Sequence, residues 1–186
     1  MSNCARSCGF SKRFFLAIPG LAILTLLGCG KVESSSQTMA QGDFTEAMSK
    51  YSEWAPVLKG DTAFTSKGHG GITVKGYINP VAQKYIDQTA NPYPLAIGTI
   101  IAKAVVKSAD TPSSMASRVY FMRKELPGFD SINGDWSYGV ANRVGGILVA
   151  DKSVDARDRS CISCHVKFKE FDFVKTVDFY KRQSTM

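Results

Sequence analysis

The chain of 186 residues is 44% hydrophobic and 21% charged, a balance typical of a single globular domain that excludes disorder throughout. The formal net charge is +7, yet many basic residues alternate with acids, as in D-A-R-D-R and K-F-K-E-F-D, and no basic stripe with aromatic residues is present. This distribution is typical of a solvated surface and argues against nucleic-acid binding.

Residues 1–28 have the layout of a secretory signal peptide. Arg6, Lys12 and Arg13 precede the apolar run F-F-L-A-I-P-G-L-A-I-L-T-L-L, the order of charge and apolarity that export signals share. Because the run is short and interrupted by Pro19, a membrane-spanning helix is not expected. We therefore predict an exported protein with a periplasmic location.

The end of this segment, L-L-G-C, resembles the cleavage box of bacterial lipoproteins, in which the cysteine becomes the lipidated first residue. Cys29 is accordingly the predicted lipidation site and would anchor the protein to a membrane. The polar, serine-rich residues 29–42 are expected to form a flexible tether. An ordinary cleaved signal, in which Cys29 has no role, is the alternative. The folded domain is expected over residues 43–186.

The first predicted elements of this domain are a helix, a loop and a strand. Apolar residues at helical spacing predict a helix with Asp43 as its N-cap. The glycines around His69 predict a loop over residues 61–71. Alternation of apolar and polar residues predicts a half-buried strand over residues 72–78, followed by a short helix over residues 81–88.

Four more segments, rich in β-branched and aromatic residues, predict strands at residues 97–107, 118–124, 135–142 and 146–150. Turn residues separate them, and long helices do not alternate with them, so the sheet should be antiparallel. After His165 the apolar residues follow no single period, and a short helix leading into an extended end is expected. The predicted fold class is α+β, mainly β: an antiparallel sheet with a few short helices and a C-terminal segment for heme attachment.

That attachment segment is the motif C-I-S-C-H. Cys161 and Cys164 are spaced to bond the two vinyl groups of one porphyrin, and His165 can then bind the iron beneath the ring. The predicted cofactor is therefore one covalent heme c. A zinc site would need four ligands, which Cys161, Cys164, His69 and His165 could supply only by bridging distant parts of the chain. A redox dithiol would normally accompany a βαβ pattern, which is absent.

The late position of the motif bears on the second axial ligand. The only methionine after His165 is Met186, the last residue, so a second ligand must come from upstream or be absent. An absent ligand leaves a five-coordinate iron that binds small molecules such as nitric oxide, carbon monoxide or hydroxylamine. Met122, His69 and Lys103 are the upstream residues that could instead make the iron six-coordinate and suited to electron transfer.

Lys103 stands in the middle of the strand I-G-T-I-I-A-K-A-V-V-K, which looks buried on both faces. Burial of an ammonium group lowers its pKa toward that of a nucleophilic amine. The alternative is that this face meets solvent, or that the alkyl chain crosses the core while its charged end reaches water.

Three segments in order resemble the cytochrome P-460 family, which includes the beta-type cytochrome c-prime proteins: the strand G-T-I-I-A-K, the segment P-G-F-D-S-I-N-G-D-W and the motif C-I-S-C-H. The resemblance covers roughly residues 54–180. It implies a mainly antiparallel β fold, usually a homodimer, whose heme is held by Cys161 and Cys164 with His165 as the proximal ligand.

For catalytic members, the resemblance implies that the lysine aligned with Lys103 forms an extra covalent bond to the porphyrin edge. Such enzymes oxidise hydroxylamine, with nitric oxide, to nitrous oxide. Beta-type c-prime members lack this bond and bind nitric oxide and carbon monoxide in a pocket capped by phenylalanine, for which Phe64 is the candidate here. His69 is a second candidate for the distal pocket, or an exposed loop residue.

The sequence departs from the catalytic pattern at two points. The family lysine is often followed by glutamate, but here Ala104 follows Lys103. Catalytic members also use a distal glutamate as a proton relay, and the nearest acid to the corresponding strand is Glu125, at a turn. Three functions therefore remain open: a hydroxylamine-oxidising enzyme served by a redox partner cytochrome, a gas-binding cytochrome without turnover, and a plain electron carrier.

Overall fold

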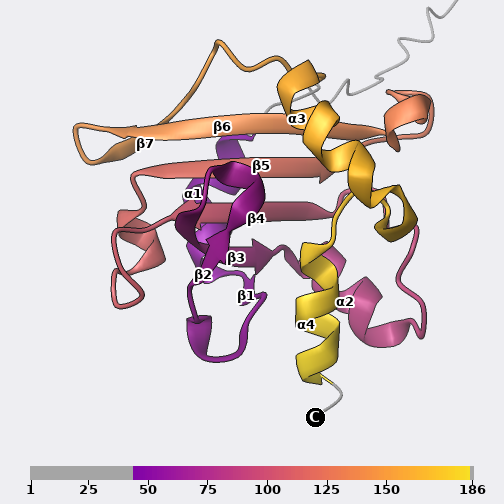
Figure 1. The fold of residues 1–186 in the computed structure, drawn as a ribbon, viewed down its shortest axis with the longest axis horizontal. Coiled ribbons are helices and arrows are strands. Elements are labelled where there is room, and N and C mark those ends of the chain that lie inside the picture. The colour runs from indigo at the N-terminus through magenta and orange to yellow at the C-terminus, as the bar shows by residue number, and fades with distance from the viewer. Residues whose placement is uncertain (1–43, 185–186) are drawn as a thin grey trace, which may run out of the picture. The chain divides into compact units, whose positions relative to one another are not determined.

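The computed structural model describes residues 44–184. The predicted signal peptide, the tether, Cys29 and Asp43 lie outside these residues. The strands, shown in Figure 1, are β1 (Ala55–Pro56), β2 (Phe64–Ser66), β3 (Ile72–Ile78), β4 (Ile100–Val105), β5 (Arg118–Lys124), β6 (Trp136–Val144) and β7 (Ile147–Ala150). The helices are α1 (Thr45–Lys50), α2 (Pro80–Gln88), α3 (Arg159–His165) and α4 (Thr176–Ser184), and short 3₁₀ turns lie between several of the elements.

The strands form one antiparallel sheet of seven strands in the order β1-β3-β4-β5-β6-β7, and β2 also pairs with β3. The mainly β, antiparallel architecture predicted from the sequence is thus confirmed. From β3 to β7 each strand pairs with the one that precedes it along the chain. Long β-branched segments form the central strands, where the side chains pack on both faces.

Two predicted elements are wrong. Residues 61–71, expected to be a loop, include β2, whose three residues are too short to show a period and are held by pairing with β3. The C-terminal end is not extended but forms α4. Its apolar residues follow no single period because Asp172 and Phe173, at positive φ, separate a 3₁₀ segment from the helix.

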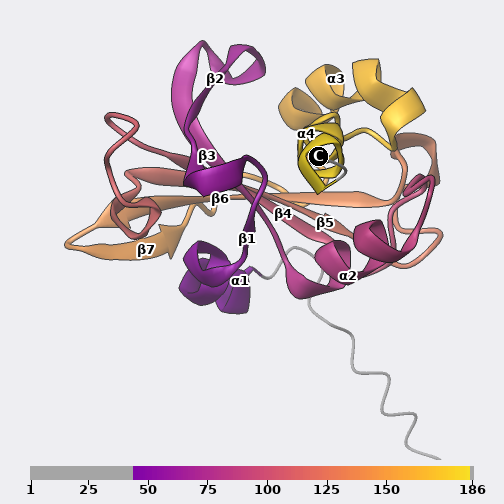
Figure 2. The same ribbon diagram turned by 90° about the horizontal axis from the view of Figure 1, so that it is seen from below.

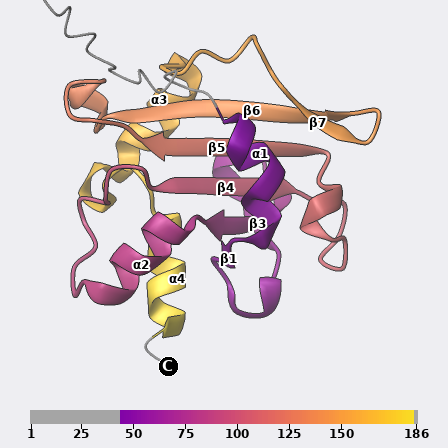
Figure 3. The ribbon, with the colours of Figure 1, turned by 180° about the vertical axis from the view of Figure 1, so that it is seen from behind.

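One face of the sheet is covered by α1, as seen from behind in Figure 3. Phe44, Ala47 and Tyr51 pack there against Ala102 and Phe121. The ring of Phe44 is stacked on that of Phe121, with centroids 5.4 Å apart. Because side chains alternate along a strand, Lys103 and its neighbours Tyr120 and Met122 lie on the opposite face.

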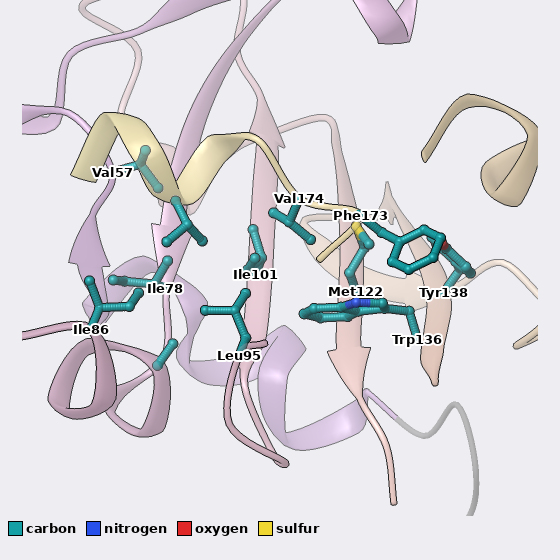
Figure 4. Packing of buried hydrophobic residues seen from close by; sticks show 12 residues of the cluster. Val57, Ile78, Ile86, Leu95, Ile101, Met122, Trp136, Tyr138, Phe173 and Val174 are labelled. Atoms are coloured by element: carbon teal, nitrogen blue, oxygen red, sulfur yellow. The ribbon is translucent and has the colours of Figure 1, made fainter. Parts of the chain in front are cut away.

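That opposite face carries the second core cluster, drawn in Figure 4. Ile101, Met122 and Trp136 come from the sheet, while Val174 and Val177 come from the C-terminal segment. Figure 2 shows the β2 hairpin and the helices α3 and α4 rising on the same side of the sheet. None of the helices in the described part of the chain has the length and apolarity needed to cross a membrane.

Gly139 in β6 should be hard to replace. A Cβ atom at this position would overlap the ring of Phe44, which packs directly on the backbone. We expect Gly139→Ala to lower the free energy of unfolding by about 1–3 kcal/mol, because the α1 contact must move. Urea denaturation measures this. Gly68→Ala is the control, since a Cβ there meets open space, and equal losses in the two variants would contradict the expectation.

Candidate functional site

A cavity of about 690 Å³ lies above strands β4, β5 and β6, lined by the β2 hairpin on one side and by α3 and α4 on the other. Its volume falls within the range of about 300–1,000 Å³ that is usual for ligand and cofactor sites. The structure brings together around it all the site residues that the sequence predicted within the described part of the chain: Phe64, His69, Lys103, Cys161, Cys164 and His165.

Helix α3 presents the two cysteines and His165 together. The side chain of Asp158 caps this helix by accepting hydrogen bonds from the backbone N–H groups of Ser160 and Cys161, at 2.8 Å and 3.3 Å. Residues three and four apart share one face of a helix, so Cys161, Cys164 and His165 face the cavity together. These three residues are called the clamp below. Both thiols are free, that of Cys161 half-buried and that of Cys164 exposed. Burial, with the nearby Asp158 carboxylate, raises the pKa of the Cys161 thiol to about 11.

His165 is held in one tautomer. Its Nδ1–H donates a hydrogen bond of 2.8 Å to the backbone carbonyl of Phe173. A carbonyl only accepts, so the proton is on Nδ1 and the Nε2 lone pair is free to bind a metal. Burial lowers the pKa of His165 to about 4, and the imidazole is therefore neutral near pH 7.

The carbonyl that orients His165 belongs to a tightly held turn. Asp172 and Phe173 both have positive φ, 48° and 66°, a conformation that is costly for residues other than glycine. Buried contacts hold the turn: Lys124 Nζ donates to both carboxylate oxygens of Asp172, at 2.6 Å and 2.8 Å, and Trp136 Nε1 donates to the Asp172 carbonyl at 2.9 Å. The backbone N–H of Leu95 donates to the same carboxylate at 2.8 Å.

Lys103 lines the cavity from the centre of β4, in register with Tyr120 of β5. Burial lowers the pKa of its ammonium group to about 8, and among the described residues it forms no ion pair. Its charge also lowers the pKa values of His69 and His165, so the amine lies within electrostatic reach of both rings. A substantial neutral fraction near pH 8 makes this amine a nucleophile.

His69 is placed by the loop between β2 and β3. Its Nδ1 shares a hydrogen bond of 2.8 Å with the hydroxyl of Ser66, and the backbone N–H of Gly71 donates to the Ser66 carbonyl at 3.0 Å. Its ring lies 4.5 Å from the ring of Tyr120 and 6.4 Å from that of His165, between centroids. Burial lowers the pKa of His69 to about 4. It is therefore a cavity residue rather than an exposed loop residue.

Phe64 lines the same cavity from β2. Its ring contacts that of Phe179 in α4, with centroids 6.2 Å apart, so an aromatic pair joins the hairpin to the C-terminal helix. The acid considered from the sequence lies elsewhere: Glu125 is buried in a hydrogen-bonded pair with Arg123, at 2.8 Å, and with Ser137, at 2.5 Å. Among the described residues, those that line the cavity include no carboxylate.

Tyr138 is a cavity residue that the sequence interpretation missed. Its ring lies 5.5 Å from that of His165, and its hydroxyl is buried without a hydrogen-bond partner among the described residues. The register of the strands places it there. Tyr138 pairs with Met122, and Val140 pairs with Tyr120, so Tyr138 and Val140 lie on the same face of the sheet as Lys103. That inference needs the strand pairing, which the sequence alone does not supply.

These residues fit a covalently bound heme. Two free thiols and a histidine with a free Nε2 lie on one helix face beside a largely apolar cavity, and the orphaned Tyr138 hydroxyl is a donor for a polar group placed there. Within residues 44–184, no three histidine, cysteine, aspartate or glutamate side chains are grouped as metal ligands. The four-ligand arrangement of a structural zinc site is therefore not offered by the described residues.

Comparison with known proteins finds no family model that matches the chain and no curated protein similar to it in sequence. The functional interpretation therefore depends on the residues of the site itself.

Proposed function

We propose that the chain is an exported heme c protein of the cytochrome P-460 type, which acts on hydroxylamine and nitric oxide. Cys161 and Cys164 hold the heme by thioether bonds, and His165 is the proximal ligand. The observation that carries the proposal is the convergence, around one cavity, of this clamp with Lys103, a lysine with no ion-pair partner among the described residues.

When bound, the heme supplies a redox-active iron that binds small nitrogen ligands. The chain supplies the surroundings. The Phe173 carbonyl orients His165 through Nδ1, the aromatic pair of Phe64 and Phe179 limits access of water, and Lys103 presents an amine at the centre of the sheet face. Oxidation of hydroxylamine releases protons and electrons, so the proposal includes an oxidising partner cytochrome.

A second candidate, a gas-binding cytochrome without turnover, is favoured by one observation. The catalytic members that the sequence resembles use a distal glutamate to relay protons, and the residues described around the cavity include no carboxylate. In this version nitric oxide or carbon monoxide binds reversibly in the pocket beneath Phe64, and Lys103 is not bonded to the porphyrin. The proposal also includes a periplasmic location with a lipid anchor at Cys29, and a homodimer.

The state of Lys103 separates the two candidates. We expect the tryptic peptide that contains Lys103 to carry the heme, because its amine, without an ion-pair partner among the described residues, lines the cavity that the ring would fill. A heme with this extra bond should absorb to the red of an ordinary ferrous heme c. Lys103→Arg should remove the bond, return the absorption to that of an ordinary heme c, and reduce hydroxylamine oxidation by at least about tenfold.

Mass analysis after denaturation, with hydroxylamine consumption in the presence of an electron acceptor, measures both effects. Lys107→Arg is the matched control, since it makes the same change at an exposed position beyond the strand. A heme-free Lys103 peptide together with nitric oxide binding and no hydroxylamine consumption would favour the gas-binding candidate. A chain without covalent heme would contradict both.

A further inference from the structure

The spacing of the two histidine rings carries information about the iron. His69 and His165 come from the β2 hairpin and from α3, and their ring centroids are 6.4 Å apart in the same cavity. The planes of the rings are inclined at 59°, so the rings are not stacked on each other. The two imidazoles are not bonded to each other through Nδ1, because each Nδ1 has a partner of its own.

The distance agrees with two histidines bound to one metal. Two metal–nitrogen bonds of about 2.0–2.1 Å, with about 1.1–1.2 Å from each nitrogen to its ring centre, give roughly 6.2–6.6 Å. A histidine that instead hydrogen-bonds a ligand on the iron adds a hydrogen bond of about 2.9 Å between that ligand and its nitrogen, which places the centroids roughly 8 Å apart or more. The observed spacing matches direct ligation.

The hydrogen bonds of the two imidazole rings also agree with ligation of one metal by both histidines. Nδ1 of His165 donates to the Phe173 carbonyl, and Nδ1 of His69 is bonded to the Ser66 hydroxyl. Each ring therefore has its Nδ1 occupied by a partner. The carbonyl fixes the proton of His165 on Nδ1, whereas the Ser66 hydroxyl can accept from His69 or donate to it. When Ser66 accepts, His69 has the same tautomer as His165, with Nε2 able to bind a metal.

The hairpin holds His69 in place. The Gly71 N–H bonds back to the Ser66 carbonyl at 3.0 Å, which closes the loop, and the Tyr120 ring lies 4.5 Å from the His69 ring. The other upstream candidates are placed differently. Met122 also lines the cavity, but its side chain packs within the buried core cluster beneath the C-terminal segment. Lys103 lines the cavity from the centre of β4, whereas His69 lines it from the loop of the β2 hairpin.

We propose that His69 is the second axial ligand of the heme iron in the resting protein, opposite His165, so that nitric oxide, carbon monoxide or hydroxylamine binds only by displacing it. This inference rests on the proposed heme attachment. It replaces the open, five-coordinate iron expected from the sequence with a six-coordinate resting state. The cavity then selects ligands by their ability to compete with an imidazole, which favours nitric oxide over weaker ligands.

The test uses the full chain carrying its heme. The wild-type protein should be low-spin in both oxidation states, by optical absorption and electron paramagnetic resonance. His69→Ala should become high-spin and return to low-spin when imidazole is added. Carbon monoxide should bind the ferrous wild type slowly, at a rate that levels off with its concentration, and His69→Ala at least about tenfold faster, because no internal ligand must leave first.

Lys67→Ala is the matched control in the same loop: Lys67 lines the cavity as His69 does, but its side chain is exposed, and the variant should stay low-spin. Met122→Leu and Lys103→Arg should also stay low-spin, which tests the competing ligands. A high-spin wild type with attached heme, or a low-spin His69→Ala variant, would overturn the inference while leaving the proposed function intact. A high-spin wild-type spectrum overturns the inference even where a variant fails to fold. A chain with no covalent heme would instead overturn the proposed function, and this inference with it.

Discussion

Replacing Cys161 and Cys164 together by serine should yield a protein that carries no covalently bound heme. A serine hydroxyl does not add to a porphyrin vinyl group as a thiol does, so both attachment points are lost. Heme staining after denaturation and mass analysis measure the result, with one heme per chain expected for the wild type. Each single variant should retain a heme through its remaining thioether bond.

The fold should survive this double change. Cys164 is exposed, and Cys161 is half-buried at the edge of the core cluster, where serine is close to it in size, so far-ultraviolet circular dichroism should still show the sheet. Ser163→Ala is the matched control, because Ser163 lies on the same helix outside the cavity lining and should retain full heme content. Covalent heme in the double variant would refute the clamp, since these are the only cysteines in the described part of the chain.

Lys124→Met should destabilise the protein by about 3–5 kcal/mol, because it leaves the buried carboxylate of Asp172 without its partner. The two side chains are only 10% and 8% exposed. Lys124 also lies over the Trp136 ring, 5.3 Å from its centroid, and this contact is lost as well. The free energy of unfolding in urea is the measurement.

Two variants sharpen this expectation. Adding Asp172→Asn to Lys124→Met should recover part of the loss, because no uncompensated charge is left buried, and the departure from additivity reports the coupling. Lys50→Met is the matched control, since its pair with Glu46 is 57% and 81% exposed and should cost about 0.5 kcal/mol or less. A Lys124→Met protein as stable as this control would mean that the pair does not hold the turn.

The sequence alone was sufficient to predict the central strands and the grouping of site residues, for different reasons. The strands could be predicted because runs rich in β-branched residues, such as I-I-A-K-A-V-V, strongly favour strands. The attachment motif could be recognised because heme c attachment requires this spacing of Cys161, Cys164 and His165. Lys103 stood out because a charged residue interrupts an apolar strand. The identity of the bound group stays a prediction, to be decided by the heme measurements above.

What the sequence did not reveal depends on contacts between distant segments. Strand β2 is too short to show a period and exists through its pairing with β3. The Phe173 carbonyl that orients His165 has no side-chain signature, since any residue offers a carbonyl. The pair of Lys124 and Asp172 joins residues far apart in the chain, and neither position looks unusual by itself. Such features become visible only when the sheet is assembled.

The succession of strands has a consequence for how the protein is made. Because each strand from β3 to β7 pairs with its predecessor in the chain, the sheet is built from local contacts, which favour rapid folding. Helix α3 follows the last strand, so a chain that emerges from its N-terminus first completes the floor of the cavity before the two thiols arrive. For the proposed heme protein, this order places the strands that line the cavity before the helix that carries the two thiols, and α4, which lines the cavity as well, after it.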